Sequence, residues 1–520
     1  MSKSKSRIAG VIDIGSGSIR LVIGQKSGKT VSILEMLENV VQLGKDTFDS
    51  GKITQSTINE TINILLKYKN VLESYEVDNI RVIATTAVRE AENRDVFVDT
   101  LKLKTGFSIE VFPVGDTVFY IDSYLYYNLQ DRYPVHDKNL LIAEMGAGTL
   151  DISVMTNGFM VMSIGLPLGL LKLKQLASSL SGTQEETQTG ILDYIETELV
   201  SISRYMPDIH IDDIIIIDEN FTSYLEYILP DTRWEKTFFA FSRDNAEILF
   251  DKILHVTPDE LVRDFSMPRN LAEEADMTAL ILDGFFSHLK KEKIYIIETS
   301  LHYALLMNIL FGYGLPKRRN IIEHLMSFVE TLGSRFTIDK KHAHHVSFLA
   351  KILFNALRKQ MGLAKKFLSY LLIAAFLHDI GKFISNRAHH KHSLYIINTL
   401  NLFRMSDQEI SIIGNIARYH RKSSPVSRHA QYQYLNPNHQ ILVQKLSAIL
   451  RIADALDRSH KQKIKKIEVS DQDNSLIRIT AFCEDPVPLE KMAFERKKEQ
   501  FEDITGTGIS LMVKEAWMKD

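Results

Sequence analysis

Two short segments of the sequence share a pattern of one acidic residue, two glycines and a hydroxyl residue. The first segment is Asp13–Ser18 (DIGSGS) and the second is Glu144–Thr149 (EMGAGT). Glycines let backbone N–H groups approach an anion closely, and the hydroxyl adds a further donor. The acid at the end of the preceding strand can hold a divalent ion or orient a water. One such turn is common in ordinary hairpins, but two equivalent turns predict a pair of phosphate-binding loops.

A third segment, Leu377–Lys382 (LHDIGK), places a histidine and an aspartate side by side at the end of an apolar helix. Further histidines and an aspartate lie in separate predicted helices on either side. Imidazole nitrogen and carboxylate oxygen together suit Mn²⁺, Fe, Mg²⁺ or Zn²⁺, and a mixed set can bridge two ions. The second half therefore predicts a metal centre, with His389 and His390 as either substrate contacts or surface residues. Its candidate ligands are His345, His378, Asp379, His392, His420 and Asp454.

The elements that must position the glycine turns are strands. Residues 8–24 and 139–156 each predict a strand, a turn and a second strand, because branched apolar residues favour strands. The two copies lie about one domain length apart, which indicates duplication of an α/β unit rather than a solenoid, whose repeats span ~20–50 residues. Apolar residues at helical spacing predict a helix over 54–73, and a further strand follows at 81–85.

The second half of the chain has a different pattern. Helical periodicity dominates from about residue 300, and residues 314–320 (GLPKRRN) predict a linker. A hairpin pattern from residue 463 is followed by an amphipathic helix over 489–501. We therefore predict four domains, at 1–130, 131–300, 301–462 and 463–520.

Composition and charge exclude several classes of protein. Hydrophobic residues make up 45% and charged residues 24%, which argues against disorder and against fibrous repeats. The net charge of -3 gives no general attraction to nucleic acid or to an anionic membrane. The single cysteine, Cys483, excludes an intrachain disulfide. The longest apolar stretch, around 371–377, is shorter than the ~18 residues of a membrane span. We expect a cytoplasmic protein with no membrane or nucleic-acid partner.

The order of motifs resembles the Ppx/GppA family of exopolyphosphatases and guanosine pentaphosphate phosphohydrolases. The resemblance lies in Val11–Val22 (VIDIGSGSIRLV), Ala84–Asn93 (ATTAVREAEN), Leu166–Leu173 (LPLGLLKL) and the helical second half. It implies an actin-like fold, in which two ribonuclease H-like subdomains clasp phosphates and Mg²⁺ between two glycine turns. It also implies a homodimer and a substrate that is polyphosphate or a guanosine nucleotide. The implied phosphate-binding set is Asp13, Gly15, Ser16, Gly17, Ser18, Arg20, Gly146, Gly148 and Thr149, with Arg89 and Glu144 in catalytic roles.

Three positions depart from the family pattern. The second turn begins with Glu144 rather than aspartate, and Ala147 stands between its glycines, at a position where we expect a strained, positive φ. The family's catalytic glutamate falls in residues 113–118, where Asp116 is the only carboxylate, one or two positions away. A later Gly-Gly-Thr motif is replaced by residues 219–221 (ENF). A general base one position out points the wrong way. We take Asp116 as the catalytic candidate and expect polyphosphate to be hydrolysed slowly or not at all.

The histidine-rich half resembles the HD phosphohydrolase superfamily, with His345, then His378 and Asp379, then Asp454 in that order. The resemblance implies Mn²⁺, Fe or Zn²⁺ at this site. The predicted fold is an α/β actin-like two-lobed module, an all-α HD domain and a small α+β unit. Three functions remain open: phosphoanhydride hydrolysis in the actin-like cleft; hydrolysis of a nucleotide or phosphodiester at the HD site, with the cleft as a sensor; and non-catalytic binding of polyphosphate or a nucleotide.

Overall fold

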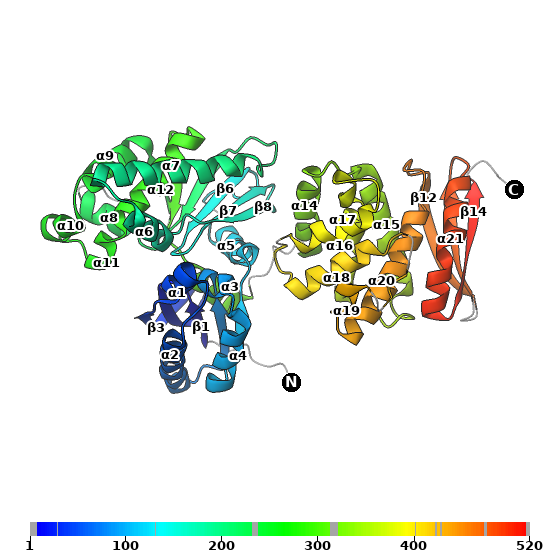
Figure 1. Cartoon of the computed structure of the whole chain (residues 1–520), viewed down its shortest axis with the longest axis horizontal. Helices are drawn as coiled ribbons and strands as arrows, with labels where there is room; N and C mark the ends of the chain where they lie inside the picture. The colour runs from blue at the N-terminus through cyan, green and yellow to red at the C-terminus, as the bar shows by residue number, and fades with distance from the viewer. Residues whose placement is uncertain are drawn as a thin grey trace. The chain divides into compact units, whose positions relative to one another are not determined.

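The computed structural model (Figure 1) divides the chain into two units, Met1–Arg319 and Asn320–Asp520. The division follows helix α13 (Leu301–Phe311), which packs on strands of the first unit, so this helix does not begin the second unit as the predicted boundary at residue 300 required. The predicted linker at 314–320 lies outside the described residues. The structure describes residues 8–28, 30–129, 132–230, 238–312, 321–400, 402–421, 424–426, 429–472 and 476–515.

The first lobe of the first unit is built on a five-stranded sheet in the order β3-β2-β1-β4-β5. Strands β1, β2 and β3 are antiparallel neighbours, whereas β4 and β5 run parallel to β1. The predicted strand–turn–strand at 8–24 is thereby confirmed. The strands are β1 (Ile8–Ile14), β2 (Ser18–Ser27), β3 (Thr30–Val40), β4 (Asn79–Ala84) and β5 (Ile109–Val111).

Helix α2 covers this sheet and confirms the helix predicted at 54–73. Its N-cap Thr54 accepts a hydrogen bond from the Thr57 N–H, as a capping hydroxyl does. Its buried Tyr68 donates to the Ile19 carbonyl oxygen at 2.7 Å, which ties the helix to β2. The helices of this lobe are α1 (Leu43–Ser50), α2 (Gln55–Ser74), α3 (Thr86–Glu90) and α4 (Arg94–Thr105).

The second lobe repeats the first. Its sheet has the order β10-β11-β9-β6-β7-β8. Without the edge strand β10, the order and directions match the first sheet strand for strand, with β6, β7, β8, β9 and β11 in the places of β1, β2, β3, β4 and β5. This equivalence supports the duplication inferred from the two turns. The strands are β6 (Leu140–Met145), β7 (Leu150–Thr156), β8 (Phe159–Leu166), β9 (Asp213–Ile217), β10 (Phe238–Ser242) and β11 (Lys293–Ile297).

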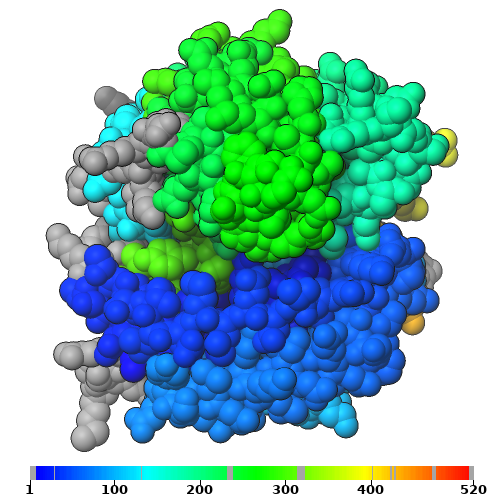
Figure 2. All heavy atoms as spheres, turned by 90° about the vertical axis from the view of Figure 1, so that its left-hand side faces the viewer, coloured from blue at the N-terminus to red at the C-terminus, as the bar shows by residue number. Residues whose placement is uncertain are grey.

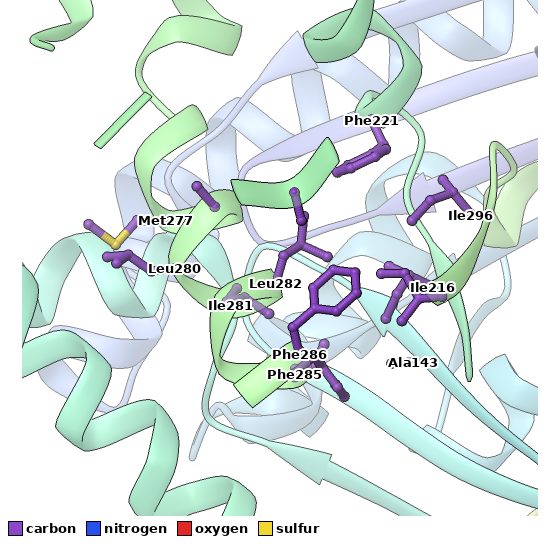
Figure 3. Packing of buried hydrophobic residues seen from close by; sticks show 14 of the residues in the cluster. Ala143, Ile216, Phe221, Met277, Leu280, Ile281, Leu282, Phe285, Phe286 and Ile296 are labelled. Atoms are coloured by element: carbon purple, nitrogen blue, oxygen red, sulfur yellow. The ribbon is translucent and has the colours of Figure 1, made fainter. Parts of the chain in front are cut away.

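The core of the second lobe lies between its sheet and helix α12. Figure 3 shows Phe286 of α12 directed towards Ile216 of β9, with Ile296 of β11 close by. These side chains are at most 1% exposed, so the helix is anchored on the strands that end at the cleft. The helices are α5 (Val114–Leu129), α6 (Leu170–Ser179), α7 (Gln184–Ser203), α8 (Phe221–Ile228), α9 (Arg243–Leu254), α10 (Pro258–Phe265), α11 (Arg269–Ala272) and α12 (Ala275–Leu289).

Two helices carry the chain between the lobes. Helix α5 follows β5 of the first lobe and packs on β7 and β8 of the second, and α13 follows the second lobe and packs on β1, β2 and α5. Figure 2 shows the lobes in space-filling form, with the first lobe in blue below the green second lobe. The two crossings keep the turn after β1 facing the turn after β6.

The second unit is a helical bundle followed by a small sheet. Helix α16 is buried along its whole length and ends immediately before His378. The predicted hairpin and terminal helix are confirmed as β12, β13 and α21, and an unpredicted strand, β14, pairs parallel to β13. The elements are α14 (Ile321–Ser334), α15 (Lys340–Leu357), η1 (Lys365–Phe367), α16 (Leu368–Leu377), η2 (Ile380–Phe383), α17 (His389–Asn398), α18 (Asp407–Arg418), α19 (Ala430–Gln433), α20 (Pro437–Ala455), β12 (Ile464–Gln472), β13 (Leu476–Cys483), α21 (Pro488–Thr505) and β14 (Gly508–Glu515).

Membrane insertion by a helix finds no support in the described part of the chain. None of the helices there combines the length and the hydropathy that a membrane span requires.

Candidate functional site

The two glycine turns of the first unit line one cavity of about 450 Å³. In the first turn, the Gly15 N–H donates to the Ser18 carbonyl oxygen at 2.9 Å. In the second, the Gly146 N–H donates to the Thr149 carbonyl oxygen at 3.0 Å. The same closing bond in both lobes shows that the repeated sequence pattern forms the same turn twice. The cavity takes in the whole phosphate-binding set predicted from sequence, namely Asp13, Gly15, Ser16, Gly17, Ser18, Arg20, Gly146, Gly148 and Thr149.

Close packing, and not a positive φ, explains one of the turn glycines. A Cβ on Gly148 would lie 2.8 Å from Thr86 Cγ2 and 2.9 Å from Phe48, across the lobe boundary. The four turn glycines and Ala147 are all absent from the described residues with positive φ. The concern that Ala147 strains the second turn is therefore wrong, because its backbone is in a region that any residue adopts.

Two guanidinium groups from the first lobe reach the cavity. Arg89 donates from Nη1 to the Phe112 carbonyl oxygen at 2.9 Å and from Nη2 to Thr86 Oγ1 at 3.0 Å. Arg20 donates from Nη1 to Glu219 Oε2 at 2.7 Å and from Nε to Glu38 Oε1 at 2.8 Å. Arg89 is thus held mainly by neutral acceptors, which leaves its positive charge for an anionic ligand.

Three carboxylates of the cavity have unused oxygen atoms. Asp13 Oδ1, Glu144 Oε2 and Asp151 Oδ1 are buried and lack hydrogen-bond partners in the part of the chain that the structure describes. Burial raises the pKa of Asp13 to about 7. Burial, and then the neighbouring Asp151, raises the pKa of Glu144 well above its usual value. Buried carboxylates without partners are costly unless a cation balances them, and Mg²⁺ prefers such oxygens. Each of these carboxylates is therefore a candidate oxygen ligand for a divalent cation, although the three do not form a compact ligand group among the described residues.

The predicted catalytic Asp116 is not among the residues that line the cavity. Thr117 lines it instead. Both lie in the first turn of α5, where one position rotates a side chain by about 100°. The prediction of Asp116 as the catalytic carboxylate is therefore wrong on geometry.

The structure adds Asp151, which the sequence reasoning missed. It pairs with Glu144 in the β6–β7 register, at the place that Arg20 occupies opposite Asp13 in the first lobe. Burial raises its pKa, and the charge of Arg89 opposes that rise. A residue count across the predicted hairpin at 139–156 would have found this position.

The end of β9 contributes a further acidic pair. Burial raises the pKa of Asp218 to about 7, although its Oδ1 accepts the Asn220 N–H at 2.7 Å. Glu219 Oε1 lies 3.5 Å from His302 Nδ1, and His302 Nε2 lies 2.9 Å from Ser300 Oγ. The altered third motif at 219–221 therefore still supplies polar groups to the cavity.

The second unit contains a separate cluster of imidazoles and carboxylates around Asp379. Asp379 Oδ2 lies 3.5 Å from His378 Nε2, whereas Oδ1 lies 3.2 Å from His389 Nε2. The cluster contains two groups of three residues whose potential metal-ligand atoms all lie within 4.8 Å of one another. Asp379 belongs to both groups and has the position of a bridging carboxylate. The first group consists of His342, His378 and Asp379, and the second group consists of Asp379, His389 and His420.

The four histidines have the same orientation within this cluster. Each Nδ1 lies within hydrogen-bonding distance of a carbonyl or carboxylate oxygen, which directs Nε2 towards the aspartates. Metal-bound histidines have this arrangement, because the second ring nitrogen fixes the tautomer. The pairs are His342 with Asp457 (2.8 Å), His378 with the Ala375 carbonyl (2.7 Å), His389 with the Asn386 carbonyl (3.1 Å) and His420 with the Ala417 carbonyl (2.7 Å).

Two of the six predicted metal ligands are misplaced. His342, three residues before His345 on α15, faces the cluster, while the His345 ring stacks on Phe348 with a centroid distance of 6.2 Å. His392 belongs to neither group, and His389 takes the place predicted for it. The other four lie in the cluster, which brings together His378, Asp379, His420 and Asp454, with Asp454 Oδ1 at 3.5 Å from His342 Nε2 and 3.7 Å from His378 Nε2.

Charge within the cluster suits a cation. Burial lowers the pKa of His378 and, more strongly, that of His420, so both imidazoles are neutral near pH 7, as ligands must be. Burial alone would lower the pKa of His342, but hydrogen bonds to Asp454 and Asp457 raise it to about 9. Each of the two carboxylates also pairs with a lysine, since Lys382 Nζ lies 2.5 Å from Asp379 Oδ2 and Lys497 of α21 forms an ion pair with Asp454.

Comparison with known proteins places both units in one family. The model of the Ppx/GppA phosphatase family matches residues 21–310, and that of Ppx/GppA phosphatase domain III matches residues 326–493. The chain is 21% identical over 498 residues to a guanosine-5'-triphosphate,3'-diphosphate pyrophosphatase from Pseudoalteromonas atlantica, covering 90% of each chain. It is 25% identical over 205 residues to a bifunctional 3-dehydroquinate synthase/phosphatase from Fusobacterium nucleatum, covering 37% of this chain and 30% of that protein.

Solved structures agree in fold. An exopolyphosphatase from Cytophaga hutchinsonii has a TM-score of 0.51 at 18% identity, covering 59% of this chain and 98% of that one. A Ppx/GppA family member from Aquifex aeolicus has a TM-score of 0.50 at 19% identity, covering 59% and 99%. These likenesses support the actin-like, two-lobed fold seen in the repeated sheets. The family models together span most of the chain, and the chain belongs to the Ppx/GppA phosphatase family.

Proposed function

We propose that the cavity of the first unit hydrolyses the terminal phosphoanhydride bond of inorganic polyphosphate or of guanosine pentaphosphate. One observation carries this proposal: two facing glycine turns, two guanidinium groups and three carboxylates with unused oxygens line the same cavity. The names of the relatives, a guanosine pentaphosphate-type pyrophosphatase and an exopolyphosphatase, support the two substrates.

Each part of the cavity has a role in this proposal. The N–H groups and hydroxyls of the two turns hold the terminal phosphate, and Arg89 neutralises its oxygens, as an arginine fork can. Asp13 and Glu144 would hold Mg²⁺, which supplies positive charge at the phosphate oxygens. Asp151 orients the attacking water and accepts its proton, since a carboxylate with a raised pKa suits a general base. Most of the catalysis is then positioning and charge stabilisation.

Phosphate release from polyphosphate and from guanosine pentaphosphate, measured with Mg²⁺, tests the proposal. Arg89→Gln removes a charged hydrogen bond worth about 1.5–3 kcal/mol, so kcat/KM should fall about ten- to a hundredfold. Arg94→Gln is the matched control, because Arg94 pairs with the adjacent Asp95 away from the cavity lining. Equal rates for wild type and Arg89→Gln would contradict the proposal.

A second function is favoured by the cluster in the second unit. We propose that this helical domain is an HD-type, metal-dependent phosphohydrolase of a nucleotide or phosphodiester, with the cavity of the first unit then able to act as a sensor. The observation is the set of four imidazoles already oriented around Asp379 and Asp454. A divalent Mn, Fe or Zn ion bound there would activate water for attack on phosphorus.

Hydrolysis of bis(p-nitrophenyl) phosphate with Mn²⁺ tests the second function. His378→Ala should abolish it, whereas Arg89→Gln should leave it unchanged. If neither substrate class is turned over by wild type, the third reading, a polyphosphate- or nucleotide-binding regulator, is the one that stands. The homodimer implied by the family resemblance remains a prediction, which light scattering of the purified chain would test.

A further inference from the structure

A buried lysine from the last helix lies against the metal-type cluster. Lys497 of α21 forms an ion pair with Asp454 Oδ2, and its side chain is only 12% exposed. The other oxygen of this carboxylate, Oδ1, faces His342 and His378. The carboxylate therefore separates the two environments, with imidazoles on one side and an ammonium group on the other. A metal ion bound through Oδ1 would leave Lys497 in place.

A second buried cation lies one turn before Asp454 on α20. Arg451 is 7% exposed and donates from Nη1 to the Tyr419 carbonyl oxygen at 3.3 Å, next to His420. Its Nε is buried and has no acceptor among the residues that the structure describes. A buried guanidinium with an unused donor is costly. Arg451 therefore has a free hydrogen-bonding position beside the cluster.

A third basic residue follows shortly after Asp454 in the sequence. Arg458 follows α20 and is exposed. Burial lowers the pKa of Lys497, Asp454 raises it, and the charges of Arg451 and Arg458 lower it further. Burial lowers the pKa of Arg451, and two acidic groups oppose this: Asp454 and the solvent-exposed Glu499. Lys497 thus pairs with the buried Asp454, and Arg451, one turn earlier on α20, still has an Nε without an acceptor in the described part of the chain, which an anionic ligand would supply.

We propose that Arg451 and Lys497 form an anion subsite beside the cluster and bind a phosphate group of its ligand. Guanidinium forks and ammonium groups are the protein's usual partners for phosphate oxygens. Helix α21 of the small terminal unit is then part of the ligand site and not only a cover for its sheet. The proposal rests on the second function proposed above, because the ligand is a phosphate ester held between this subsite and the metal ions.

Titration of inorganic phosphate into the full-length, Mn²⁺-loaded protein tests the subsite by calorimetry. All samples carry Arg89→Gln, which weakens phosphate binding in the first unit equally. Lys497→Gln should raise the phosphate Kd at least about tenfold, the loss expected for one buried charged hydrogen bond. Lys497→Arg should recover most of the affinity. The matched control is Lys498→Gln, since Lys498 pairs with Glu495 on the same helix and should stay within about twofold of wild type.

The Mn²⁺ content of the same samples separates the outcomes. Unchanged Mn²⁺ with weakened phosphate binding in Lys497→Gln supports the subsite. An unchanged phosphate Kd overturns it, and so does joint loss of Mn²⁺ and phosphate, which would make Lys497 a positioning residue for Asp454. If wild type takes up no Mn²⁺, the second function fails on its own. The same comparison of Lys497→Gln with Lys498→Gln on metal-free protein then decides for or against the anion subsite.

Discussion

His342 and His345 offer a matched test of the metal-type cluster, because both lie on α15 three residues apart. His342 Nε2 lies 3.5 Å from Asp454 Oδ1 and 4.0 Å from Asp379 Oδ2, and its Nδ1 lies 2.8 Å from Asp457 Oδ2. His345 is in neither ligand group. We predict that His342→Ala removes one of two Mn²⁺ sites and that His345→Ala removes none.

The size of the effect follows from the contacts. Loss of a partner that only orients a metal ligand costs 10–100-fold in affinity, so loss of the His342 ligand should cost about 100-fold or more. The affected site is that of His378 and Asp379, whereas the His389 and His420 site should keep its ion. In metal-free protein, His342→Ala should also lower the free energy of unfolding by about 1–3 kcal/mol, because fully buried Asp457 loses its imidazole partner.

Equilibrium dialysis against Mn²⁺, followed by elemental analysis, measures both variants side by side. Circular dichroism confirms that each variant is folded, so that a lost site is not an unfolded protein. The reasoning is refuted if His345→Ala loses as much Mn²⁺ as His342→Ala, or if His342→Ala binds as tightly as wild type.

Three further predictions concern the first unit. Thr117→Glu adds a carboxylate to the cavity lining besides the proposed base Asp151 and should raise the slow polyphosphate hydrolysis at least about tenfold, within the range of a general base. Asp116→Asn should change it by less than about twofold, and steady-state phosphate release checks both. Gly148→Ala should lower the free energy of unfolding by about 1–3 kcal/mol, since its Cβ would meet Thr86 at 2.8 Å, whereas Gly17→Ala, with no atom within 4 Å, should be neutral in urea titrations. Burial raises the pKa of Asp218 from 3.8 to about 7, so the folded chain retains a proton that the unfolded chain releases. Asp218 alone should therefore lower the free energy of unfolding by at most about 1.4 kcal/mol per unit as pH rises from 4 to 7, and Asp13, whose pKa is also raised to about 7, adds to this fall. Asp218→Asn should remove only the Asp218 share of the fall.

The repeated architecture of the first unit could be predicted from sequence because its signals are local. Each glycine turn lies between two strands whose branched apolar residues are contiguous, and both turns close with the same backbone bond. The cavity between them followed from the equivalence of Asp13 and Glu144. Strands β3, β5, β8, β10, β11 and β14 were not predicted, because their pairing depends on the sheets to which they add.

The wrongly predicted site residues lie on helices, where a single sequence does not show which face of the helix points towards the site. His342 and His345 differ by only about 60° around α15, so apolar periodicity accepts either as inward-facing. Contact with Asp457 after α20 decides between them, and that contact exists only in the folded chain. Asp116 was preferred to Thr117 for its carboxylate, although a single step along α5 turns it out of the cavity lining. The chemistry of the side chains identified the residue types, but not which position around each helix faces the site.

The central claim is that phosphoanhydride hydrolysis takes place in the cavity of the first unit. The most direct measurement is the initial rate of phosphate release from polyphosphate with Mg²⁺, for wild type, Asp13→Asn and His378→Ala under identical conditions. We expect Asp13→Asn to lose at least about tenfold in rate, the effect of one lost charged contact, and His378→Ala to stay within about twofold of wild type. The reverse pattern, with full activity in Asp13→Asn and none in His378→Ala, would contradict it.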